Sequence, residues 1–155
     1  MCKDIISRRK DENDFKEEIH ILNVEGKEEV KAEINPNNLL DNQAEFTEAQ
    51  KKKVEEYNRE NKPYYVIHNH PKNGFPTQND FNHIYDNKYI FGIIICHNGT
   101  IYKYYKPHRL MTDLDWEEIK RDIKFAKKIY KNKSEEDIAI NIYSRYNFKF
   151  ERISK

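Results

Sequence analysis

Cysteines are scarce in this chain and long apolar runs are absent. Only Cys2 and Cys96 are present among 155 residues, which excludes a framework of disulfide bonds. The N-terminal stretch MCKDIISRRKDEND lacks the apolar core of a signal peptide, and no run approaches the ~18 residues of a membrane span. We therefore expect a cytoplasmic protein with no membrane partner.

An excess of charge of one sign is also missing. The 28 Lys and Arg residues nearly balance the 27 Asp and Glu residues, so the formal net charge is +1. The run Lys51–Lys53 is followed by Glu55 and Glu56, a mixture typical of a solvated helix face. This balance disfavours nucleic acid as a partner. With 37% hydrophobic residues, the chain can bury one core.

The most informative segment is Val66–Asp80, with the sequence VIHNHPKNGFPTQND. His68 and His70 end an apolar run, and residues i and i+2 of a β-strand point to the same face. Asp80 follows ten residues later and adds an anionic oxygen. Two nitrogens and one oxygen leave a fourth tetrahedral position open for water, which is the pattern of a catalytic zinc site.

A second interpretation of the same segment is structural. Thr77 to Asp80 has the T-x-x-D pattern of a capping box, in which Thr77 caps a helix and Asp80 reaches back to it. The two interpretations are compatible, because a helix that begins at Thr77 holds Asp80 rigidly in its first turn, as a metal ligand should be held.

At these residues the chain resembles the JAB/MPN/JAMM metalloproteases, whose signature is an upstream Glu, then H-x-H-P, then S-x-x-D. The HNHP form is most similar to the bacterial and phage branches, including RadC-like domains. Thr77 replaces the usual Ser and preserves the hydroxyl, and the preceding loop is one residue shorter than in the best-known members. The resemblance covers about residues 15–106. The matching residues are His68, Asn69, His70, Pro71, Thr77 and Asp80.

The resemblance implies a site and a reaction. A zinc ion would be held by the two histidines and the aspartate, and a glutamate at the start of an early strand would act as general base. That position points to Glu18, with Glu17 as the alternative. Thr77 would steady the oxyanion. The expected activity is hydrolysis of a peptide or isopeptide bond by a metal-activated water.

The substrate is expected to be an extended protein or peptide chain, and a ubiquitin-like protein conjugate is one candidate. Phe75 and the loop Asn35–Gln43 would flank it, although Phe75 also suits packing of the loop onto the domain. Two other functions stay open: a JAB-like binding or scaffold module without turnover, and a RadC-like DNA-associated protein.

The order of predicted elements indicates the α+β class, with a JAB/MPN-like β-sheet flanked by helices. We divide the chain into an N-terminal segment (1–14), a metal-binding core (15–106) and a helical C-terminal extension (107–155). The patterns predict a hairpin around Glu25-Gly26, helices over 47–61, 77–86 and 113–132, a further helix from Ser134, and strands over 64–68, 89–96 and 101–105. Asp113 or Asp115 is expected to cap the third of these helices.

The remaining histidines and Cys96 have simpler interpretations. His83 follows Asp80 by three residues, so it is expected in the second shell or on the surface. His20 alternates with apolar neighbours, as a satisfied strand histidine does, or lies near the cleft. His97 and His108 sit beside turns and are expected to be solvated. Cys96 ends an apolar run and is expected to be a packed strand residue, not a nucleophile.

Overall fold

The computed structural model describes residues 17–34, 44–70 and 73–154. The N-terminal segment, the loop Asn35–Gln43 and Pro71 lie outside the described residues. Seven strands form one sheet in the order β3-β2-β1-β4-β5-β6-β7. They are β1 (Ile19–Asn23), β2 (Glu28–Ile34), β3 (Ala44–Glu45), β4 (Tyr64–His70), β5 (Tyr89–Cys96), β6 (Ile101–Tyr105) and β7 (Phe150–Arg152).

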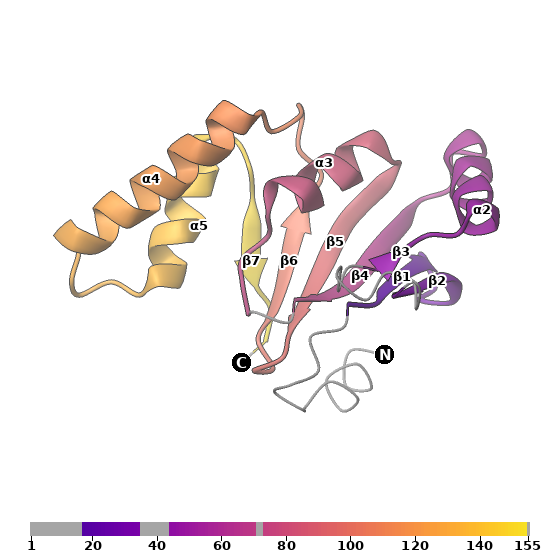
Figure 1. Ribbon diagram of the computed structural model, residues 1–155, viewed down its shortest axis with the longest axis horizontal. Helices are drawn as coiled ribbons and strands as arrows, with labels where there is room; N and C mark the ends of the chain where they lie inside the picture. The colour runs from indigo at the N-terminus through magenta and orange to yellow at the C-terminus, as the bar shows by residue number, and fades with distance from the viewer. Residues whose placement is uncertain (1–16, 35–43, 71–72, 155) are drawn as a thin grey trace.

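Four helices accompany this sheet in the described part of the chain, which is therefore α+β, as predicted. Figure 1 shows α4 and α5 beyond β7 at one end of the sheet and α2 at the opposite end, while α3 lies in front of β5 and β6. The helices are α2 (Glu48–Arg59), α3 (Gln78–Asp86), α4 (Asp113–Ile129) and α5 (Glu135–Arg145).

The pairing of β4 with its two neighbours positions the site. β4 pairs antiparallel with β1 and parallel with β5, and α3 lies in the crossover between the two parallel strands. In such a crossover the helix begins near the end of the first strand. The end of β4 and the first turn of α3 are therefore brought together.

The two faces of the sheet bury different sets of side chains. One face contributes Ile21, Val66, Ile94 and Tyr104 to the main core, which also includes buried residues of α2, α3, α4 and α5. The other face carries a smaller buried cluster of Leu22, Ile67 and Ile95. This alternation along each strand assigns neighbouring residues of β1 and β4 to opposite faces.

One predicted cap differs from the structure. Helix α4 is capped by Thr112, not by Asp113 or Asp115. The Thr112 hydroxyl accepts from the Asp115 N–H at 3.1 Å, and the Asp115 carboxylate accepts from the Thr112 N–H at 2.9 Å. This is the T-x-x-D capping box again, in which the acid is the third helical residue, so Asp115 serves the cap from inside the helix.

Gly92 is expected to be essential for the stability of the sheet. It lies opposite Tyr104 in the β5–β6 pair, and a Cβ atom at position 92 would overlap the buried Tyr104 ring. Gly92→Ala should therefore lower the free energy of unfolding by about 3 kcal/mol, the upper range for overpacking a core. Denaturant titration measures this loss. It should shrink in a Tyr104→Leu background, and an equal loss in both backgrounds would contradict the assignment.

Candidate metal centre

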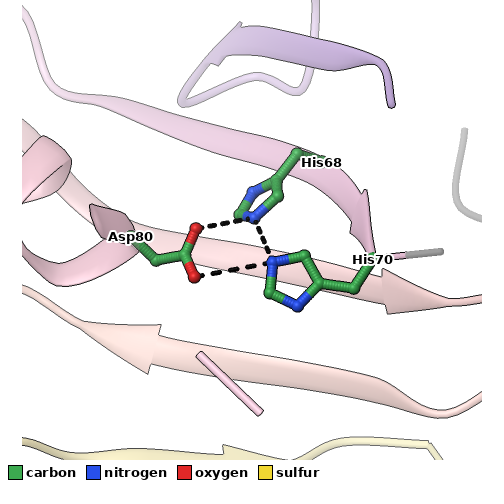
Figure 2. A group of neighbouring side chains, drawn as sticks. All are labelled: His68, His70 and Asp80. Atoms are coloured by element: carbon green, nitrogen blue, oxygen red, sulfur yellow. Dashed lines mark hydrogen bonds and ion pairs between the residues drawn. The ribbon is translucent and has the colours of Figure 1, made fainter. Parts of the chain in front are cut away.

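The end of β4 and the start of α3 supply a three-residue cluster that could hold a metal ion. Among the described residues, His68, His70 and Asp80 each offer one ligand atom, all within 4.8 Å of one another. Figure 2 shows both imidazoles and the carboxylate directed toward a common point. The structure thus brings together the three ligands that the sequence predicts.

The separations between these ligand atoms suit a small cation. His68 Nε2 lies 3.0 Å from His70 Nε2 and 2.9 Å from Asp80 Oδ1, and His70 Nε2 lies 3.5 Å from Asp80 Oδ2. Tetrahedral ligands ~2.1 Å from one ion are about 3.4 Å apart. Changes of a few tenths of an ångström therefore convert this arrangement into a coordination shell.

Neighbouring groups fix the orientation of two ligands. His70 Nδ1 lies 3.2 Å from the Gly74 carbonyl oxygen, an acceptor that favours the proton on Nδ1 and leaves Nε2 for the metal. The Thr77 hydroxyl and the Thr77 N–H both donate to Asp80 Oδ2, at 2.7 and 2.6 Å. Thr77 was expected to steady an oxyanion, but its hydroxyl proton is directed at Asp80, so the geometry favours a role in orienting this ligand.

The electrostatics of the cluster favour the binding of a cation. Burial opposes ionisation of Asp80, yet the nearby His68 and His70 imidazoles hold its pKa well below the usual range. Burial likewise opposes protonation of His70, but the hydrogen bond and charge of Asp80, the Gly74 carbonyl and the charge of Glu17 together raise its pKa. A largely buried carboxylate that stays ionised attracts a cation.

Glu17 and Glu18, the two candidates for general base, lie on opposite faces of the sheet. Ile19 pairs with His68 in the antiparallel β1–β4 ladder. Continued one and two residues past this last pair, the same register would set Glu18 opposite Asn69 and Glu17 opposite His70, and opposed residues share a face. Glu17 is therefore on the face of the metal ligands, in agreement with its effect on the pKa of His70.

Glu18 belongs to a buried polar cluster on the other face. Its carboxylate Oε2 lies 3.4 Å from His20 Nε2 and 3.8 Å from Lys31 Nζ. His20 Nδ1 in turn contacts the Glu28 carboxylate. The expectation that Glu18 faces the histidines is thus not met, because strand alternation turns its side chain away. His20 is a buried strand histidine, as its apolar neighbours indicate, but it is only partly satisfied, because its Nε2 makes no hydrogen bond within the described residues.

Asn69 is a residue of the site region to which we assigned no role from the sequence. It is fully buried, and its Oδ1 accepts from the Glu18 N–H at 2.7 Å, just beyond the end of the β1–β4 ladder. Its Nδ2 lies 3.1 Å from His97 Nε2. The side chain between the two metal ligands therefore fastens the Glu17-Glu18 segment to β4. The H-N-H triplet could have predicted this structural role, because strand alternation turns Asn69 away from the two ligands.

Phe75 packs against the domain in the structure. Its ring meets those of Tyr102 and Phe150, with centroid separations of 5.6 Å in both pairs. These contacts favour the structural interpretation of Phe75 over a substrate contact. The loop Asn35–Gln43, the other predicted substrate neighbour, lies outside the described residues.

The other histidines and Cys96 lie outside the ligand set. The His83 ring neighbours those of Phe46 and Tyr89, and burial together with the charge of His68 lowers its pKa. His108 is exposed, as expected, whereas His97 is half-buried beside Asn69. Cys96 is fully buried, and burial raises the pKa of its thiol to about 12, so it is a packed strand residue.

Searches of protein-family models, curated proteins and solved structures find no match to this chain. Within the described residues, no helix combines the length and apolar character needed to cross a membrane. Within the described residues, the metal cluster and the placement of the two glutamates are the features that indicate a function.

Proposed function

We propose that this chain is a zinc-dependent hydrolase of the JAMM type that cleaves a peptide or isopeptide bond. The observation that carries the proposal is the convergence of His68, His70 and Asp80. Glu17 supports it, because the β1–β4 register directs its side chain to the same face and its charge acts on His70. Two imidazoles and one carboxylate are the protein ligands of many catalytic zinc sites. The H-x-H-P and T-x-x-D pattern, which resembles the JAMM signature, supports the same reaction class.

Different residues of the site have different roles in the proposed reaction. His68, His70 and Asp80 would hold a zinc ion, which when bound would act as a Lewis acid, lowering the pKa of water toward ~7 and polarising the scissile carbonyl. Glu17 takes the proton from the attacking water and returns it to the leaving amine, which makes it general base and then general acid. Thr77 and Gly74 hold two ligands in orientation through the hydrogen bonds described above.

The contacts of the two glutamates support different roles for them. Glu18 anchors the start of β1 through its backbone N–H and its contact with His20 on the opposite face. This anchoring restricts where Glu17, the preceding residue, can move. We therefore assign the base to Glu17 and a structural role to Glu18.

Metal content and cleavage products test the proposal together. Tag-free protein should contain about one zinc per chain by elemental analysis. Wild type and Glu17→Gln are then incubated with lysate from the source organism, and new protein termini and released lysine adducts are compared by mass spectrometry. We expect termini or adducts that depend on both zinc and Glu17. Bound zinc without any such products would favour a binding module without turnover.

A further inference from the structure

The C-terminal extension contacts the segment that carries the metal ligand Asp80. The Tyr143 hydroxyl, on α5, donates to the Pro76 carbonyl oxygen at 2.8 Å in a buried position. The Met111 backbone exchanges two hydrogen bonds with the Asn82 side chain, at 2.8 and 2.9 Å. Gln78 Nε2 also donates to the Met111 carbonyl at 3.0 Å. Residues from two segments of the extension thus hold α3 and the residue before its cap.

Aromatic packing reinforces these hydrogen bonds. Phe81, the residue after Asp80, is fully buried, and its ring lies 6.0 Å from that of Tyr143 and 5.3 Å from that of Phe148. The Tyr143 ring also meets Phe150 edge-on at 5.0 Å. Packing of this density leaves α5 few ways to shift without moving the first turn of α3.

The Tyr143 hydrogen bond acts on one peptide unit. The carbonyl of Pro76 and the N–H of Thr77 belong to the same planar group, so fixing the oxygen also fixes the direction of the N–H. That N–H donates to Asp80 Oδ2 at 2.6 Å. A continuous chain of contacts therefore runs from Tyr143 through the Pro76–Thr77 peptide to the carboxylate that would bind the metal.

We propose that Tyr143 is a positioning residue for the metal centre, and that α5 tunes metal affinity by holding the Pro76–Thr77 peptide plane. This inference rests on the metal site of the proposed function and does not depend on hydrolysis. The extension, which lies beyond the region of family resemblance, is then part of the metal-binding unit.

A matched pair of tyrosine variants tests the inference. Tyr146 is the C-cap residue of α5, and its hydroxyl also donates a hydrogen bond at 3.0 Å, but to Asp122 of α4. Tyr143→Phe should weaken zinc binding about 10-fold, the lower end of the effect of losing an outer partner of a metal site. Tyr146→Phe should bind zinc as wild type does. Competition with a chromogenic zinc chelator measures the dissociation constants.

Two further measurements separate positioning from loss of fold. Amide hydrogen exchange of the metal-free protein should be faster at Thr77 in Tyr143→Phe and unchanged there in Tyr146→Phe. Thr77→Val removes the hydroxyl contact with Asp80 and should weaken zinc binding when made in wild type. Made in Tyr143→Phe, the same substitution should weaken zinc binding by a smaller factor, because both substitutions act on the ligand Asp80.

The outcomes are distinguishable. Equal zinc affinity in Tyr143→Phe and Tyr146→Phe would overturn the inference. It would also be overturned if the effects of Thr77→Val and Tyr143→Phe on zinc affinity were fully additive and amide exchange at Thr77 were unchanged in Tyr143→Phe. A wild-type protein that binds zinc but cleaves nothing would overturn the proposed hydrolysis alone. A wild-type protein that binds no zinc would overturn both.

Discussion

His70→Ala should abolish zinc binding while leaving the fold intact. The variant removes one of three protein ligands, so its effect on affinity should exceed the about 10–100-fold loss expected for an outer partner such as Thr77. The rest of the core does not depend on this side chain, which lies at the end of β4. At free zinc 100 times the dissociation constant, wild type should gain about 2.7 kcal/mol of stability and the variant none.

Thermal unfolding with and without zinc checks this expectation. His108→Ala is the matched control, because His108 is an exposed histidine outside the cluster, and it should keep the full zinc-dependent stabilisation. Unfolding of metal-free His70→Ala at ambient temperature would show instead that the site is structural. Retained zinc binding in the variant would remove His70 from the ligand set.

Glu17→Gln should lower kcat by about 10²–10⁴-fold, the usual contribution of a general base. The amide keeps the shape of the side chain but cannot accept the proton of the attacking water. Zinc affinity should stay near that of wild type, because Glu17 is not among the three ligands. Steady-state kinetics on a peptide that spans a cleavage site identified in lysate, together with chelator competition, measure the two quantities.

Glu18→Gln is the neighbouring control for this experiment. Its side chain lies on the opposite face of the sheet, near His20 and Lys31, so turnover should persist in properly folded protein. Loss of turnover in Glu18→Gln with retention in Glu17→Gln would reverse the assignment and return the base to Glu18. The pair therefore tests the strand register as well as the chemistry.

The parts of the site that depend on local geometry were predictable from the sequence. His68 and His70 share a face because they are two residues apart in a strand, and Asp80 is held by the capping box that its spacing from Thr77 indicates. The strands β5 and β6 match their predicted ranges, since their apolar runs are bounded by clear turn signals.

The parts of the site that depend on tertiary pairing were not predictable from the sequence. Choosing between Glu17 and Glu18 requires the register of β1 against β4, which is set by contacts between residues about fifty positions apart. A shift of one residue moves a side chain to the other face, and no local signal in the segment resolves this. The orientation of Phe75 depends in the same way on Tyr102 and Phe150, which come later in the chain.

The hydrogen bond between Tyr143 and Pro76 has a consequence for biosynthesis. The two residues are 67 positions apart, and both metal-binding histidines precede them in the chain. At ~5–20 residues per second, a ribosome adds Tyr143 about 3–13 seconds after Pro76. Asp80 follows Pro76 by only four residues, so for nearly all of that interval the nascent chain carries every metal ligand without the helix that braces the Asp80 segment. If α5 tunes metal affinity as proposed, full affinity is acquired only once this helix has been synthesised and has packed against the Pro76–Thr77 peptide.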